Sequence, residues 1–162
     1  MEKTNAMRLL DRAHVSYIPR MCDCADGAID GVSVARKLGI APETGFKTLV
    51  TRGADGGIYV FVVPSPSELD LKKAAAAVDV KSVAMVRQNE LVPLTGYVHG
   101  GCSPIRMKKR FPTIIDSTAQ QHECITVSAG KIGALVTLAP AALIEVCGAA
   151  FADILTKTEA NA

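Results

Sequence analysis

One lysine lies in an apolar segment, where burial of its charge would be costly unless the charge had a function. Lys47 lies within the apolar run at 46–50 (FKTLV), whose composition is typical of a β-strand. Alternation along a strand puts Lys47 on the same face as Leu49 and opposite Phe46. If that face is the core, the ammonium would orient an anionic substrate group or act as a base. If the face is exposed, Lys47 is an ordinary surface lysine.

A glycine-rich loop is the second candidate for chemistry. Gly100 and Gly101 precede Cys102, Ser103 and Pro104. Adjacent glycines let the backbone approach a ligand closely, and free N–H groups there can bind an anion or the oxyanion of an acyl-transfer reaction. The loop is neither a nucleophile elbow nor a phosphate-binding P-loop, so a plain tight turn is the alternative.

Four cations follow this loop within five residues: Arg106, Lys108, Lys109 and Arg110. Beside a glycine loop, they would steer a polyanion toward it. The alternative is the solvated face of a helix.

The five cysteines do not have the spacing of a metal site or of a disulfide framework. Cys22 and Cys24 form a close pair, but no second pair with metal-ligand spacing exists, so we expect neither a metal nor another cofactor. Cys102 with His99 would make a thiol nucleophile and its base, although inert buried thiols are the commoner case. Asp116 ends a predicted strand and is a candidate supporting acid.

The elements that must position these residues mix helices and strands without a regular βαβ rhythm. We therefore expect an α+β fold whose mixed or mostly antiparallel sheet curls toward a barrel. The predicted helices and helical turns are at 4–14, 32–38, 68–78, 89–94 and 140–147, and the predicted strands at 15–18, 46–51, 58–63, 82–86, 113–116, 125–128 and 135–138. The polar tail at 157–162 is expected to fray.

Composition limits the class of protein. The chain has 162 residues, 49% of them apolar, which predicts one globular domain with a sizeable core. A net charge of +2 argues against binding to nucleic acid mainly by charge, without excluding a local basic patch. No apolar run is long enough to span a membrane and no signal-peptide core is present, so we expect a cytoplasmic protein with reduced thiols.

Several ordered segments resemble the YbaK/EbsC family of bacterial Cys-tRNA(Pro) deacylases, which are free-standing relatives of the editing domain of bacterial prolyl-tRNA synthetase. The resemblance covers nearly the whole chain, and the order and spacing of the segments make it more specific than any single motif. The segments are 3–6 (KTNA), 46–50 (FKTLV), 68–75 (ELDLKKAA), 94–98 (LTGYV), 100–105 (GGCSPI), 107–109 (MKK) and 127–131 (VSAGK).

The resemblance implies a single editing domain over residues 1–162, with a barrel-like mixed sheet flanked by helices. It implies metal-free hydrolysis of the ester between a mischarged amino acid and the 3′ end of tRNA, with prolyl-tRNA synthetase as a partner. In Cys-specific relatives, the thiol of the substrate attacks the ester and leaves as a cyclic thiolactone.

On this resemblance we assign three groups of residues. The catalytic group is Lys47, Gly100, Gly101 and Ser103. The substrate-binding group is Cys102, Pro104, Ser128, Gly130 and Lys131, and the tRNA-binding group is Arg106, Lys108, Lys109 and Arg110.

Three positions depart from the family pattern. Cys22 or a neighbour stands where a tyrosine is common, Val136 where an acid or amide is frequent, and Arg106 where glycine is frequent. These departures leave Ala or Ser open as the mischarged amino acid. They also leave open a non-catalytic member that binds tRNA, a nucleotide or a synthetase. A separate alternative is a hydrolase or acyltransferase that depends on Cys102.

Overall fold

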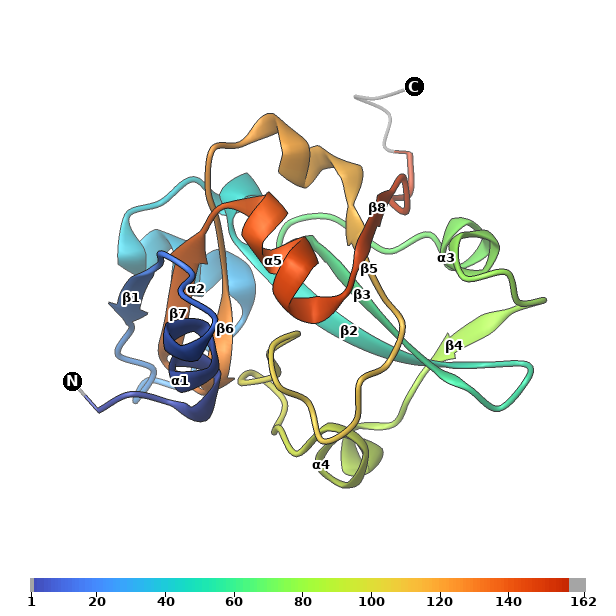
Figure 1. The fold of residues 1–162 in the computed structure, drawn as a ribbon, viewed down its shortest axis with the longest axis horizontal. Coiled ribbons are helices and arrows are strands. Elements are labelled where there is room, and N and C mark those ends of the chain that lie inside the picture. Colours follow the sequence, from blue (N-terminus) through green and yellow to red (C-terminus); the bar gives the residue numbers. More distant parts are fainter. Residues whose placement is uncertain (1, 158–162) are drawn as a thin grey trace.

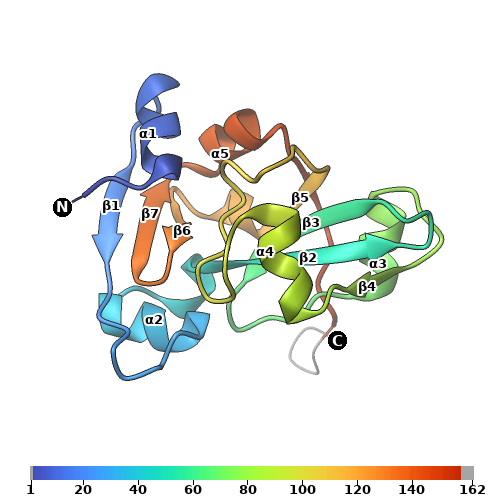
Figure 2. The same cartoon turned by 90° about the horizontal axis from the view of Figure 1, so that it is seen from below.

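The strands form two sheets in the computed structural model, which describes residues 2–157 (Figures 1 and 2). The smaller sheet is antiparallel, with strand order β1-β7-β6, and the larger one is mixed, with order β4-β2-β3-β5-β8. The strands are β1 (Ile18–Met21), β2 (Phe46–Gly53), β3 (Ile58–Pro64), β4 (Val83–Met85), β5 (Thr113–Asp116), β6 (Ile125–Lys131), β7 (Ala134–Leu138) and β8 (Ala150–Ala152).

The two sheets meet where the chain enters β2. Gly45, directly before β2, forms a parallel bridge with Thr126 of β6. This bridge joins the two sheets at one corner. The pairs β3–β5 and β5–β8 are parallel, whereas β2 pairs antiparallel with both of its neighbours, so the larger sheet is mixed.

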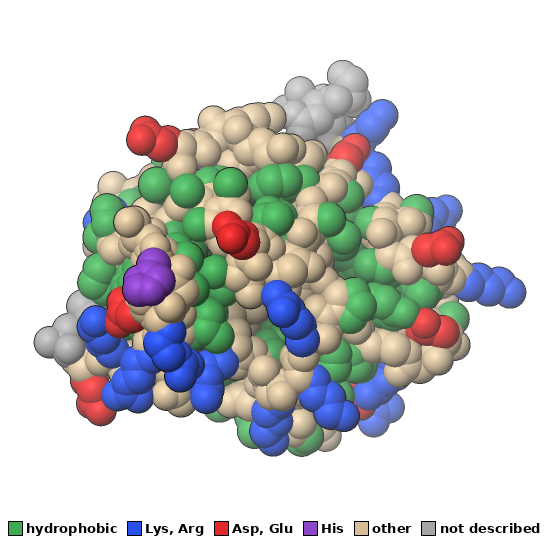
Figure 3. All heavy atoms as spheres, in the orientation of Figure 1, with side chains coloured by type: hydrophobic (Ala, Val, Ile, Leu, Met, Phe, Trp, Pro, Cys, Tyr) green, Lys and Arg blue, Asp and Glu red, His purple; other side chains and the backbone are tan. Residues whose placement is uncertain are grey.

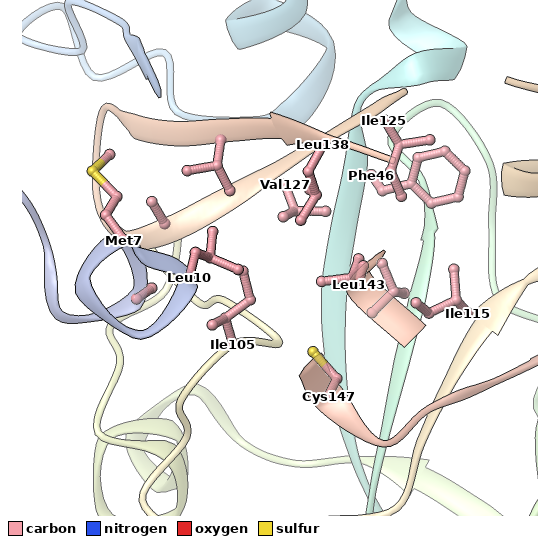
Figure 4. Close-up of a cluster of buried hydrophobic side chains, with 14 of the residues drawn as sticks. Met7, Leu10, Phe46, Ile105, Ile115, Ile125, Val127, Leu138, Leu143 and Cys147 are labelled. Carbon is pink, nitrogen blue, oxygen red and sulfur yellow. The ribbon is translucent and has the colours of Figure 1, made fainter. Parts of the chain in front are cut away.

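The main core lies between the sheets and is closed by the first and last helices. Met7 and Leu10 of α1 pack there with Val127 of β6 and Leu143 of α5 (Figure 4). Burial of such apolar side chains contributes most of the stabilisation of the fold. The catalytic candidates are therefore held by strands and loops whose other faces are fixed in this core.

The helices begin and end at residues suited to capping. They are α1 (Asn5–Arg12), α2 (Gly31–Leu38), α3 (Leu71–Ala77), α4 (Gln88–Thr95) and α5 (Pro140–Cys147), with short 3-10 helices at Pro42–Thr44 and Ser117–Gln121. The side chains of Thr4, Asp30 and Asp70 accept hydrogen bonds from first-turn amides. Gly39 and Gly96 take the left-handed conformation that ends a helix.

The α+β class is confirmed, and most predicted elements are present. The hairpin of β2 and β3 is present, as its turn chemistry predicted, and its register pairs Lys47 with Val63. The first strand is displaced to 18–21 and includes Pro19, which an edge strand tolerates. The third helix begins only at Leu71, because Asp70 caps it, and the short strand β8 was missed. The predicted fraying at 158–162 lies outside the described residues.

Candidate active site

A cavity of about 500 Å³ lies where α2, β2, the start of α4 and the β6–β7 turn come together. Its walls are mostly apolar, with a few polar groups among them, which is the usual character of a small-molecule site. The apolar wall includes Ile29, Val34, Leu38, Leu49, Val50, Met85, Leu91 and Leu135. Figure 2 shows α2, β2 and α4 around this region.

Lys47 lines this cavity from β2 and is partly buried. Burial lowers the pKa of its ammonium below the ordinary 10.5, and the charge of Glu68 acts in the opposite direction. Within residues 2–157, its Nζ makes neither a hydrogen bond nor an ion pair with the protein. A partly desolvated cation without a fixed partner is suited to bind an anionic or carbonyl oxygen of a ligand.

Thr48 follows Lys47 on β2 and has a polar side chain for which the described residues provide no partner. Its Oγ1 is buried and has no hydrogen-bond partner in the described chain, although the residue lines the cavity. An unsatisfied buried hydroxyl costs about 1–3 kcal/mol, and this oxygen is too buried to meet a ligand in the cavity as the structure stands.

The glycine loop reaches the cavity through Gly100 and Cys102. Gly100 has φ +86°, and a Cβ there would lie 2.7 Å from Cδ1 of Ile29, another residue of the cavity wall. Among the described residues, the amide N–H groups of Gly100 and Cys102 donate to no protein acceptor, whereas that of Gly101 donates to the carbonyl of Val98. The unpaired amides of these two lining residues are therefore candidate donors to an oxyanion.

Gly101 has a structural reason to be glycine. A Cβ at this position would lie 2.9 Å from the backbone nitrogen of Ile132 in the β6–β7 turn. The loop can therefore pack against this hairpin only without a side chain at 101.

Ser103 and Pro104 are buried and do not line the cavity. Ser103 Oγ accepts a hydrogen bond from the amide of Ile105, and the carbonyl of Pro104 accepts one from the thiol of Cys147. The hydroxyl of Tyr97 donates to the carbonyls of Ile105 and Arg106. In this structure these residues hold the shape of the loop.

The predicted residues of the β6–β7 turn are only partly at the cavity. Ser128 and Lys131 line it, whereas Gly130 does not. Gly130 has φ +96° and packs against the ring of Tyr97, which would lie 2.7 Å from a Cβ. Val136, expected near the pocket, is buried in the core, and its neighbour Leu135 lines the cavity instead.

Cys102 lines the cavity with a thiol that does not ionise readily. Burial raises the pKa of this thiol to about 12. At neutral pH it is therefore almost entirely protonated, and a thiol is a far weaker nucleophile than a thiolate.

The basic residues after the loop lie outside the cavity and are exposed: Arg106, Lys108, Lys109 and Arg110. Arg110 is held by a hydrogen bond to the carbonyl of Val146. Figure 3 shows basic side chains along the lower edge of the molecule, over α1 and over the region of α4 and the loop that follows it.

Sequence reasoning missed other residues of the cavity. Arg87, just before α4, is a third cation on its wall beside Lys47 and Lys131, and the only described carboxylate there is Asp30. Hydrogen bonds from Ser33 hold the pKa of Asp30 below its usual value, because they favour the ionised form. No local motif marks Arg87, because only the pairing of β4 with β2 brings it to the cavity.

Two other candidates have no place at this cavity. Asp116 is buried, and its carboxylate accepts hydrogen bonds from the amides of Thr118 and Ile154, so it joins β5 to the C-terminal segment. Within the part of the chain that is described, no group of three His, Cys, Asp or Glu side chains could hold a metal ion. None of the described helices is long and apolar enough to cross a membrane.

The sequence matches known proteins over nearly its full length. Residues 28–146 match the family of aminoacyl-tRNA editing domains. Over 156 residues the chain is 46% identical to an Enterococcus faecalis protein, EbsC, which is provisionally named a Cys-tRNA(Pro)/Cys-tRNA(Cys) deacylase. This alignment covers 96% of the present chain and 95% of that protein.

Two solved structures share the fold at 23% sequence identity. One, of a protein described as hypothetical, has a TM-score of 0.86 and covers 94% of the present chain and 100% of its own. The other is described provisionally as a trans-editing enzyme for prolyl-tRNA synthetase. It has a TM-score of 0.80 and covers 96% of the present chain and 100% of its own.

Proposed function

Because the chain belongs to the family of aminoacyl-tRNA editing domains, we propose that it deacylates mischarged Cys-tRNA(Pro) in trans. The relative that is 46% identical carries the name of such a deacylase, and its name also includes Cys-tRNA(Cys). The substrate would be the 3′-terminal cysteinyl-adenosine of the tRNA, and the reaction would be cleavage of its ester bond.

The observation that carries this proposal is the meeting of an unpaired ammonium and free backbone donors at one cavity. Lys47 projects from β2, and the N–H groups of Gly100 and Cys102 come from the loop after α4. Ester cleavage develops negative charge on the carbonyl oxygen, and donors fixed in advance stabilise that charge. We assign this role to the two amides and assign Lys47 to hold the terminal adenosine or the ester.

The thiol of Cys102 is a poor candidate for the nucleophile, since burial raises its pKa to about 12. We propose instead that the sulfur of the bound cysteine attacks its own ester carbonyl. A carbon–sulfur bond forms, the bond from the carbonyl carbon to the ribose oxygen breaks, and the thiol proton passes to that oxygen. A cyclic thiolactone leaves, and water later opens it to cysteine.

This route provides selectivity as well as rate. Reacting groups on one molecule have a large effective concentration, so the protein needs only to position the ester and stabilise the oxyanion. Shape alone discriminates by only about 1–3 kcal/mol per methylene, whereas alanine lacks the nucleophile entirely. The cavity then needs to exclude only larger side chains.

The test is the release of radiolabelled amino acid from Cys-tRNA(Pro), Ser-tRNA(Pro) and Ala-tRNA(Pro), with Lys47→Ala as the variant and Lys81→Ala as an exposed-lysine control. Rapid release of cysteine that Lys47→Ala alone abolishes supports the proposal. Hydrolysis of Ala-tRNA(Pro) but not of Cys-tRNA(Pro) would keep the deacylase and exclude the thiol route. Binding without hydrolysis would favour a non-catalytic member of the fold.

Cys102→Ala separates the substrate thiol from a protein thiol. We expect this variant to keep cysteine release within about threefold of wild type, because only a group that reacts contributes the large factors of nucleophilic catalysis. Loss of all activity in a folded Cys102→Ala protein would assign the nucleophile to Cys102.

The selection of tRNA(Pro) is a separate proposal. With a net charge of +2, the chain should bind tRNA weakly and in a salt-sensitive way. We propose that docking with prolyl-tRNA synthetase delivers the substrate, and that residues 1–162 act as one editing domain. Co-sedimentation with the synthetase, with and without tRNA(Pro), tests this step.

A further inference from the structure

Two thiols lie side by side at the edge of the cavity, and the proposed deacylation does not use them. The loop between β1 and α2 carries Cys22 and Cys24, and the sulfur atoms are 3.7 Å apart. Cys24 lines the cavity, whereas Cys22 is 9% exposed and packs behind it. Every cysteine of the chain is a free thiol.

The backbone brings these two sulfurs together. Residues two apart in an extended segment point to the same side, and neither Cys22 nor Cys24 lies in a turn. The amide of Cys22 donates to the carbonyl of Gly133 at 2.8 Å, which ties the first thiol to the β6–β7 turn.

A lysine clamps the loop from the other side. The Lys37 ammonium donates to the carbonyls of Asp23 and Ala28 and pairs with the carboxylate of Asp26 at 2.6 Å. The two thiols are therefore held close in the folded state, and they can react without a large rearrangement of the loop.

We propose that Cys22 and Cys24 are a reversible modification site, at which a hydroperoxide joins the two sulfurs in an intramolecular disulfide. The thiolate of Cys24 attacks the peroxide, whose O–O bond breaks, and becomes a sulfenic acid. The sulfur of Cys22 then displaces the hydroxyl group, which leaves as water after taking the Cys22 proton. Peroxide is reduced and both thiols are oxidised; a dithiol reductant reverses the change.

Exposure assigns the two roles. Cys24 is the more exposed thiol and meets the oxidant in the cavity. Burial raises the pKa of Cys22, the positive charge of Lys37 opposes this rise, and a protonated buried thiol is suited to resolve a sulfenic acid already beside it. This order is that of redox-sensitive cysteine pairs in general.

The other cysteines of the chain serve as internal controls. Burial raises the pKa of both Cys102 and Cys147 to about 12, so neither competes for peroxide. Cys124 is exposed, but among the described residues no second thiol lies within hydrogen-bond distance of it.

The disulfide would change the cavity wall. A disulfide bond is about 2.05 Å long, so the two sulfurs, now 3.7 Å apart, must approach by roughly 1.7 Å. Because Gly133 holds the backbone of Cys22, most of this movement falls on Cys24. We expect oxidation to draw Cys24 out of the wall and to slow deacylation, an effect that rests on the proposed function.

The first measurement does not depend on activity. The reduced protein is treated with limiting hydrogen peroxide, quenched with catalase, alkylated in denaturant and digested for mass spectrometry. We expect the peptide with Cys22 and Cys24 to be unalkylated and two hydrogens lighter, in wild type and in Cys124→Ser, and to be restored by dithiothreitol. Over-oxidation of Cys24 without a disulfide, or a disulfide between two molecules through Cys124, would overturn the proposal.

The second measurement compares kcat/KM for Cys-tRNA(Pro) before and after oxidation, within each variant. Wild type and Cys124→Ser should lose about tenfold on oxidation, whereas the ratio for Cys24→Ser, which lacks the thiol that attacks the peroxide, should stay near one. An equal loss in all three proteins would overturn the effect on activity. A reduced wild type that releases no amino acid would refute the proposed function, and the mass spectra would still decide whether the disulfide forms.

Discussion

At the residue scale, the proposed role of Lys47 depends on its charge, and therefore on the proton of its ammonium group. Its ammonium is partly buried, and burial lowers its pKa below 10.5. The charged form is therefore lost at a lower pH than for a surface lysine, as the pH rises through the lowered pKa. A binding step that needs this cation should weaken on the alkaline side.

We predict an alkaline decline in cysteine release by wild type, with a midpoint below pH 10.5. Lys47→Arg should move this decline upward, since a guanidinium stays charged to about pH 12 or beyond. The measurement is initial rate against pH with spontaneous ester hydrolysis subtracted, and Lys81→Arg is the control. An identical decline in wild type and Lys47→Arg would assign the titration to another group.

Arg106 is a strained residue that invites a separate test. It has φ +60°, a conformation that costs a residue with a Cβ about 1 kcal/mol, and it is exposed beside the glycine loop. The family pattern often has glycine there, which adopts this conformation freely. A strained arginine in place of glycine favours a contact with the tRNA.

We predict that Arg106→Gly keeps or raises the free energy of unfolding, by up to about 1 kcal/mol, and weakens tRNA affinity. Asp79→Gly is the matched control, because Asp79 has φ +57° and follows α3. Chemical denaturation and filter binding give the two quantities. If both variants bind tRNA like wild type, Arg106 makes no contact.

At the element scale, the glycine loop depends on its fit against the β6–β7 hairpin. A Cβ at Gly101 would come within 2.9 Å of the Ile132 nitrogen, which is backbone and cannot move aside cheaply. The loop must then shift away from the hairpin, and the amides of Gly100 and Cys102 shift with it. If the loop supplies the oxyanion donors, as proposed, the shift should lower kcat as well as stability.

We predict that Gly101→Ala lowers kcat by about 10²-fold, the cost of a misplaced oxyanion donor, and lowers the free energy of unfolding by about 1–3 kcal/mol. Gly45→Ala is a stability control, since its Cβ would meet only contacts of 3.6 Å or longer. Single-turnover hydrolysis and urea unfolding measure the two effects. A Gly101→Ala protein with unchanged kcat would argue against donors in this loop.

The sequence predicted the elements that have strong local signals. It predicted fewer of the contacts between elements that are distant in the chain. Turn chemistry predicted the β2–β3 and β6–β7 hairpins, and glycines predicted the ends of α2 and α4. The strand β8 was missed because it is only three residues long and its parallel pairing with β5 is non-local. Local periodicity does not contain such pairings.

The same distinction applies to the candidate site. Lys47 and the glycine loop had unusual local chemistry and do lie at one cavity. Ser103 had the right type of side chain, but its burial behind the loop depends on tertiary packing. Arg87 reaches the wall through long-range strand pairing, and no pattern around it indicates a site.

At the scale of the whole molecule, the net charge is small, but positive charge is concentrated in particular regions. The net charge is +2, yet three cations and one carboxylate line the cavity, and four exposed cations follow the glycine loop. A polyanion would therefore be attracted locally while the molecule as a whole attracts it weakly. Affinity should depend on where charge is removed, and a pair of matched variants can test this.

We predict that Lys108→Glu with Lys109→Glu weakens the binding of uncharged tRNA(Pro) and reduces the slope of log K against log salt by about one unit for each lost phosphate contact. The control is Lys72→Glu with Lys81→Glu, which changes net charge equally at exposed positions around α3, away from the cavity. Anisotropy titrations at several salt concentrations give both slopes. If only total charge mattered, the two double variants would lose affinity equally. A loss confined to 108 and 109 would place the acceptor end of the tRNA over the segment that follows the glycine loop, where its terminal ester can reach Lys47.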